Sequence, residues 1–276
     1  MMRKLFFIVS VLALFSTLSF SKERGFDGYS YMGVGFNNVK YKEEVTTKKG
    51  THVESEAIST DVYYITGGLV RLNDRYDFSY DLASTLYPND IDEDVYINGV
   101  YQTNKADILL NNMTFLLHYK LTDMHRVVGG MQYLLNTYKR FDFLSDPTQG
   151  VVEERSASLV FNCGYWYEST TAAVDGLRIT AKALIGLPVW QKTTNTNITA
   201  VDFSDAGGYN AQLSLWFSYT MFPGLEVGLG GGFDYMYREG GGPKTTTING
   251  VERNIYWPEN STETLYGVVS VTWNFR

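Results

Sequence analysis

The sequence predicts an all-β fold, a ten-stranded antiparallel transmembrane β-barrel with short periplasmic turns and five long extracellular loops. Three observations predict it: long segments alternate apolar and polar residues, long connections take turns with short ones, and the chain ends in an aromatic-rich strand. Alternation with a period of two is the signal of a strand whose two faces meet different surroundings. The pattern therefore indicates a closed sheet with one apolar and one polar face.

The N-terminal segment has the pattern of a secretory signal peptide. Arg3 and Lys4 precede an apolar run over residues 5–14, and small residues end at Ser21 before the charged Lys22. This order of basic head, apolar middle and small residues is typical of a signal peptide. The apolar run is shorter than the roughly 18 residues of a spanning helix, which makes a retained membrane helix the less favoured alternative.

Composition favours one exported domain after the signal peptide. The 276 residues include 21 Tyr, 16 Phe and 26 Gly but only six prolines, and no linker divides them. We expect a signal peptide over residues 1–21 and a barrel domain over residues 22–276. Cys163 is the only cysteine, so internal disulfides are excluded, and its neighbours Phe161 and Tyr165 favour an inert thiol on an apolar face.

Charge and motif content exclude several classes of function. The formal charge of −7 argues against nucleic-acid binding, because such proteins need a clustered positive surface. No GxSxG, HExxH or P-loop pattern stands in a plausible setting, and we expect no cofactor and no bound metal. Asp90, Asp92 and Asp94 have the spacing of the start of an EF-hand loop but lack its glycine and distal glutamate.

The length of the alternating segments favours a membrane barrel over a soluble sandwich. From Tyr209 to Met221 the odd positions are all apolar or aromatic, and all the even positions except Trp216 are polar. Residues 177–187 and 265–275 follow nearly the same pattern. Strands of soluble domains usually have about five or six residues, whereas a tilted transmembrane strand needs roughly 9 to 11.

Connection lengths support the same fold. The expected strands are residues 28–41, 61–72, 76–87, 107–121, 126–141, 156–168, 177–190, 209–221, 225–238 and 264–275. Long connections at 42–60, 88–106, 142–155, 191–208 and 239–263 alternate with short ones. Outer-membrane-type barrels place short turns in the periplasm and long loops outside, which puts both termini in the periplasm. The first two registers stay open, because residues 61–72 carry apolar side chains on both faces.

The last segment resembles the C-terminal recognition strand of Gram-negative outer-membrane β-barrel proteins. The resemblance rests on Leu265, Val269, Val271, Trp273 and Phe275, although Arg276 follows the aromatic residue that usually ends the family's chains. It implies insertion into the outer membrane of a Gram-negative bacterium by the barrel-insertion machinery. The partners implied are outer-membrane lipid and lipopolysaccharide.

The polar face of the expected strands carries charges of both signs. They are Asp77, Asp81, His118, Lys120, Arg140, Glu168, Arg178, Lys182, Glu226, Asp234 and Arg238. A small barrel has an interior just wide enough for side chains to fill, so opposite charges should pair across it. A plug of ion pairs is the favoured interpretation, and a narrow polar channel is the alternative. Gly228, Gly230 and Gly232 leave room on one strand for a bound loop, a larger neighbour such as Trp216, or a gap.

Ten strands with five long loops also resemble the omptin family of outer-membrane proteases. That family implies an Asp pair in the second outer loop and an Asp/His pair in the fourth. Asp90 and Asp92 stand in the second long loop and Asp202 in the fourth, but Ser204 occupies the histidine's position. A general base working near neutral pH is most readily a histidine, so we expect no protease activity.

His118 and His52 suggest no catalysis either. His118 should point inward near the periplasmic rim and make a structural hydrogen bond, and His52, exposed in the first loop, has no convincing partners in the sequence. The favoured function is a non-enzymatic surface barrel whose loops bind an external partner or which supports envelope integrity. A narrow porin-like channel is the first alternative, and a degenerate omptin-like protease is the second.

Overall fold

A computed structural model describes residues 27–143, 150–169, 176–198, 201–204, 207–248 and 251–275. The expected signal peptide and Arg276 lie outside these residues. Within the described ranges, no helix is long and apolar enough to cross a membrane.

The described residues form thirteen β-strands. They are β1 (Asp27–Thr46), β2 (His52–Arg71), β3 (Tyr76–Tyr87), β4 (Ile91–Ile97), β5 (Val100–Lys120), β6 (His125–Phe141), β7 (Val152–Glu168), β8 (Leu177–Asn195), β9 (Gly208–Phe222), β10 (Leu225–Arg238), β11 (Gly241–Ile248), β12 (Val251–Trp257) and β13 (Glu259–Phe275). Each expected strand lies within or close to one of these. β4, β11 and β12 are additional strands within segments that we expected to be loops.

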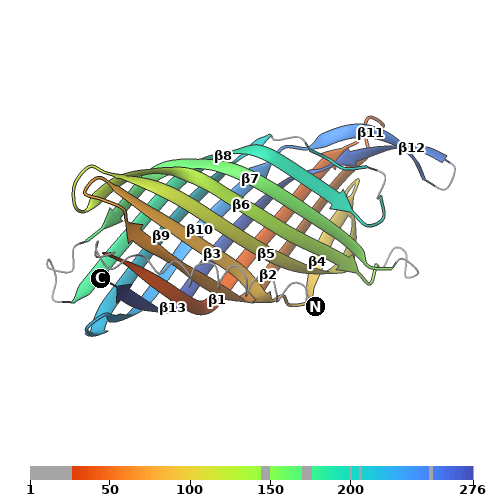
Figure 1. The fold of residues 1–276 in the computed structure, drawn as a ribbon. Helices are drawn as coiled ribbons and strands as arrows, with labels where there is room; N and C mark the ends of the chain where they lie inside the picture. The colour runs from red at the N-terminus through yellow and green to blue at the C-terminus, as the bar shows by residue number, and fades with distance from the viewer. Residues whose placement is uncertain are drawn as a thin grey trace.

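Eleven of these strands form one antiparallel sheet that closes into a barrel (Figure 1). β1 pairs with both β2 and β13, so the first and last barrel strands meet, as a membrane barrel requires. β3 and β4 share one position in the barrel wall, because each of them pairs with β2 and with β5. β11 and β12 form a separate two-stranded sheet, which Figure 1 shows beyond one end of the barrel.

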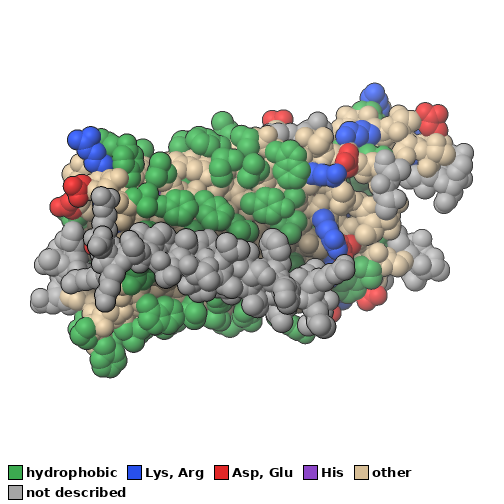
Figure 2. Space-filling view, viewed as in Figure 1, with side chains coloured by type: hydrophobic (Ala, Val, Ile, Leu, Met, Phe, Trp, Pro, Cys, Tyr) green, Lys and Arg blue, Asp and Glu red, His purple; other side chains and the backbone are tan. Residues whose placement is uncertain are grey.

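The outer surface of the barrel is apolar over its middle. On β9 the side chains of Leu213, Leu215 and Phe217 are exposed, whereas Gln212 and Ser214 between them are buried. In Figure 2, outside the grey atoms, hydrophobic side chains dominate the visible middle part of the barrel, and the charged side chains in view lie towards its two ends. Exposed apolar residues that alternate with buried polar ones are the reverse of a soluble fold, and they form the lipid-facing band of a membrane barrel.

Beyond this apolar band, the strands continue and their outer face becomes polar. On the outer face of β1 and β2, the Lys40 and Lys42 amino groups lie 2.9 and 3.0 Å from the Glu56 carboxylate. On β4 and β5, Lys105 Nζ lies 2.6 Å from Asp92 Oδ1. The expectation that residues 42–60 and 88–106 are long loops is therefore wrong. Polar strands carry no alternating pattern, and backbone pairing with cross-strand ion pairs holds them together instead.

The interior also contains apolar clusters that the sequence did not predict. One of them consists of Tyr29, Leu69, Leu116, Val128, Trp166 and Leu184. Gly230 faces Trp216 on the neighbouring strand, and a Cβ atom at Gly230 would lie 2.1 Å from Trp216 Cε3. Of the three explanations for glycine at this position, the structure shows the larger neighbour.

Candidate functional site

Charged side chains cross the lumen in three layers between the two ends of the barrel. The short-turn end carries the connections 72–75, 121–124 and 223–224, and the hairpin end carries the β1–β2, β4–β5 and β11–β12 hairpins. We call the layers the short-turn layer, the middle layer and the hairpin layer. Each layer joins strands that are far apart in the sequence.

The short-turn layer contains a chain of alternating charges. Arg126 Nε donates a hydrogen bond of 2.8 Å to Asp77 Oδ2, and Lys120 Nζ lies 2.9 Å from Asp77 Oδ1. Arg126 Nη1 in turn lies 3.2 Å from Glu168 Oε2. Asp77, Arg126 and Glu168 are all buried. Since each charge faces an opposite one, these groups can remain ionised away from water.

A second ion pair of the short-turn layer links four strands. Arg178 Nη2 lies 2.7 Å from Glu226 Oε2, and Asn274 Nδ2 donates a hydrogen bond of 2.6 Å to Glu226 Oε1. The Arg178 guanidinium carbon stands 3.9 Å from the centre of the Tyr29 ring. This cation–π contact adds to the ion pair where water is excluded. β8, β10, β13 and β1 are thereby held together across the lumen.

His118 lies inward next to the short-turn layer. Its Nε2 is 2.7 Å from Ser79 Oγ, and its ring meets the Trp166 ring edge-on at 4.8 Å between centroids. The side chain is fully buried. These contacts give His118 a structural hydrogen bond and a packing role.

The middle layer is an ion pair beside a small cavity. Lys182 Nζ lies 2.8 Å from Asp81 Oδ2, and Tyr31 donates a hydrogen bond of 2.5 Å to Asp81 Oδ1. Asp234 and Trp216 line the same cavity, which has a volume of about 60 Å³. A cavity of this size has room for a few water molecules, which can solvate the Asp234 carboxylate.

The hairpin layer places three carboxylates around one guanidinium. Arg140 Nη2 lies 2.6 Å from Glu43 Oε2, Nε lies 2.9 Å from Glu93 Oε2, and Nη1 lies 3.7 Å from Glu154 Oε2. These residues come from β6, β1, β4 and β7. Arg238 is buried nearby and donates a hydrogen bond of 2.6 Å to Ser156 Oγ. The layer thus sets three carboxyl groups and two guanidinium groups across the lumen.

The structure places all eleven sequence-predicted lumen residues on the inward face of their strands. Our sequence reasoning missed four further members of the layers, Arg126, Glu43, Glu93 and Glu154. Arg126 has the same strand parity as Arg140 on β6, so extending the alternation would have found it. The three glutamates belong to segments that we expected to be loops, so the sequence assigned them to no inward face of a strand.

The omptin-like positions make separate contacts. Asp92 pairs with Lys105 on the neighbouring strand, and Asp202 Oδ2 lies 3.0 Å from Lys192 Nζ. The hydrogen bond from Lys192 holds the pKa of Asp202 below its usual value. Each of these carboxylates therefore already faces its own lysine.

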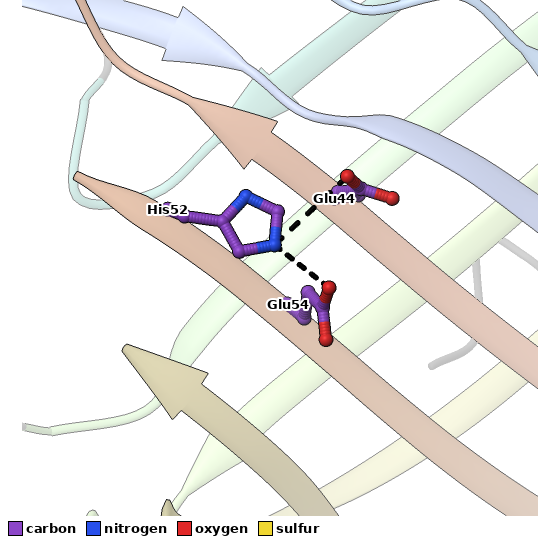
Figure 3. Close-up of side chains that lie close together, drawn as sticks. All are labelled: Glu44, His52 and Glu54. Carbon is purple, nitrogen blue, oxygen red and sulfur yellow. Dashed lines mark hydrogen bonds and ion pairs between the residues drawn. The ribbon is translucent and has the colours of Figure 1, made fainter. Parts of the chain in front are cut away.

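A further cluster lies on the outer face at the hairpin end (Figure 3). Glu44 and Glu54 are direct cross-strand partners on β1 and β2. His52 Nε2 lies 2.7 Å from Glu54 Oε1 and 3.9 Å from Glu44 Oε1, and His52 Nδ1 lies 2.9 Å from Thr46 Oγ1. The sequence analysis did not find these partners of His52. The tight 47–51 connection aligns the strands, and a hairpin register drawn from it would have found the cluster.

Comparison with known proteins identifies the class of fold. No family model matches the sequence, and no curated protein matches it. The outer membrane protease OmpT from Escherichia coli is similar in structure, with a TM-score of 0.70 at 9% identity over 94% of this chain and 99% of that chain. The translocator domain of the autotransporter NalP from Neisseria meningitidis matches with a TM-score of 0.37 at 10% identity, over 96% and 93% of the two chains. The chain therefore has the fold of the Gram-negative outer-membrane β-barrels, with omptin-like architecture.

Proposed function

We propose that this chain is a non-enzymatic surface barrel of the outer membrane of a Gram-negative bacterium. Its short-turn end faces the periplasm, and its hairpin end binds an external partner or contributes to envelope integrity. The observation that carries the proposal is the filled lumen. Arg126, Arg178 and Glu226 reach into the lumen from three different strands and are only 2%, 6% and 2% exposed.

The filled lumen favours a structural barrel over a channel. Among the described residues, the cavities between the layers have volumes of about 60, 30 and 40 Å³, enough for a few water molecules. Wider cavities, of about 740 and 140 Å³, lie against the short-turn layer and the hairpin layer at the two ends of the lumen. An ion crossing the barrel would have to separate buried charge pairs in three successive layers. Separating such a pair leaves an uncompensated buried charge, which is strongly unfavourable.

Conductance of the refolded protein tests this proposal. We expect no reproducible open step when the full barrel is inserted into a planar lipid bilayer. Heat-modifiable migration on a denaturing gel should first show that the sample is folded. A reproducible open step of the folded protein would favour the porin-like alternative and overturn the closed lumen.

The hairpin end supports the proposal of an external partner. At the tip of the β4–β5 hairpin, Tyr96, Ile97, Val100 and Tyr101 are all exposed. This tip lies beyond the lipid-facing band, on strands whose outer face carries the Asp92–Lys105 ion pair. Exposed apolar residues gathered outside the membrane are typical of protein interaction sites.

We also propose that the chain has no omptin-like protease activity. The support is that Asp92 and Asp202 each face a lysine, and that Ser204 cannot act as a general base near neutral pH. We expect no cleavage of a mixed peptide library by the refolded protein. Cleavage that disappears in the Asp90→Ala, Asp92→Ala double variant would contradict this proposal.

A further inference from the structure

We propose that Glu44, His52 and Glu54 form a binding site for one divalent transition-metal cation on the outer face of the β1–β2 hairpin. One ligand atom from each side chain lies within 4.8 Å of the other two. Figure 3 shows the three side chains converging from two adjacent strands. The site lies outside the lumen and is independent of the layers described above.

The strand register creates the site. Glu44 and Glu54 stand directly opposite each other, and His52 lies two residues before Glu54 on the same outer face. Like charges placed directly opposite on paired strands are destabilising. A bound cation between the two carboxylates would convert this repulsion into attraction, which gives the pair a reason to bind one.

The Glu44–Glu54 pair differs in charge from the next cross-strand pair on the same face of the hairpin, Lys42 and Glu56. Glu56 also points outward, but Lys40 and Lys42 neutralise it at 2.9 and 3.0 Å. Among the described residues, neither Glu44 nor Glu54 has a lysine or arginine within ion-pair distance. The negative charge at the hairpin end is therefore available to a cation from solution.

The histidine is oriented for coordination. The contact of 2.9 Å between Thr46 Oγ1 and His52 Nδ1 directs Nε2 toward the two carboxylates. A hydrogen bond to the distal ring nitrogen is the usual way in which proteins fix a metal-bound histidine. A cation at this position would replace the present contact of 2.7 Å between Nε2 and Glu54 Oε1.

The ligand set selects the chemical class of the ion. One imidazole nitrogen and two carboxylate oxygens suit zinc and similar transition metals, whereas calcium and magnesium prefer oxygen ligands alone. Zinc binds such ligands at about 2.0 to 2.2 Å, so neighbouring ligand atoms stand roughly 3 to 4 Å apart. The distances of 2.7 and 3.9 Å from Nε2 to the two carboxylates already bracket this separation.

Metal binding here would brace two hairpins at once. The His52 backbone N–H donates a hydrogen bond of 2.8 Å to Asn98 Oδ1, and the Asn98 N–H donates one of 2.8 Å to the His52 carbonyl. Asn98 occupies the tip of the β4–β5 hairpin beside Ile97 and Val100. A cation that fixes His52 therefore also fixes Asn98, and with it the exposed apolar tip of the β4–β5 hairpin.

Zinc titration of the full refolded barrel, without an added histidine tag and after treatment with a chelator, tests the site. We expect one zinc ion per chain by calorimetry, with no comparable binding of calcium. His52→Ala and Glu54→Gln should each weaken zinc binding by about tenfold or more. The matched control Glu56→Gln, on the same outer face, should leave zinc binding unchanged.

Histidine NMR provides an independent readout, because the chain has only three histidines. Zinc should shift the imidazole signals of His52 and leave those of His118 and His125 in place. Absence of zinc binding by the wild-type protein would overturn the proposal. Equal affinity in the His52→Ala and Glu56→Gln variants, or a zinc-dependent shift of His125 alone, would also overturn it.

Discussion

Single residues in the short-turn layer are held by buried opposite charges, and Asp77 faces two of them, Lys120 and Arg126. We predict that Asp77→Asn lowers the free energy of unfolding by about 3 kcal/mol, because Lys120 and Arg126 lose the carboxylate that they share and the buried Arg126 keeps only Glu168 as a counter-charge. Denaturant unfolding of the barrel in lipid vesicles measures this loss.

The exposed Lys192–Asp202 pair provides the control for that loss. Lys192→Met removes one partner of an ion pair in which both side chains are about half exposed. An ion pair this exposed contributes little to stability, because water and salt screen it. An unfolding free energy that falls equally in Asp77→Asn and Lys192→Met would contradict the role that we assign to burial.

The same surface pair carries a prediction about pH. The hydrogen bond from Lys192 lowers the pKa of Asp202, so the contact is present above the carboxyl's unfolded pKa and is lost as the pH falls through its folded pKa. In Lys192→Met the pKa of Asp202 should rise toward its usual value. Carbon NMR of the Asp202 carboxyl in an acid titration measures this rise, and an unchanged midpoint would contradict it.

At the scale of elements, the pairing of β9 with β10 depends on one glycine. Gly230→Val would place side-chain atoms where the Trp216 ring lies, since even a Cβ atom would approach Cε3 to 2.1 Å. We predict a reduced folded fraction for Gly230→Val, and recovery when Trp216→Ala is added. Heat-modifiable migration on a gel measures the folded fraction. Normal folding of the single variant would contradict the prediction.

The sequence predicted the strands inside the apolar band and failed outside it. Lipid on one side and the lumen on the other impose the alternation of Leu213, Ser214 and Leu215. Beyond the band the outer face meets water instead of lipid, while the inner face still carries buried polar residues such as Glu93, so Glu43 on β1 and the whole of β4 show no apolar–polar alternation. Their pairing depends on hairpin register and on contacts such as Lys105 with Asp92, which hydropathy does not record.

Across the whole molecule, strand parity predicted which charges point inward but not which of them meet. Arg178 and Glu226 could be assigned to one lumen from the sequence. Their distance of 2.7 Å depends on the stagger between strands, and this stagger follows from the tilt of the closed barrel. The group of three carboxyls around Arg140 escaped prediction for the further reason that they lie on strands beyond the lipid-facing band.

The three layers stand in series along the lumen, and this arrangement determines whether removing one layer lets ions through the barrel. Removing both partners of a pair, as in Arg178→Ser with Glu226→Ser or Asp81→Ser with Lys182→Ser, leaves no unpaired partner from that pair behind. We predict that neither double variant conducts ions in a planar bilayer, because the hairpin layer around Arg140 still closes the path. An open step in either variant would show that a single layer seals the barrel.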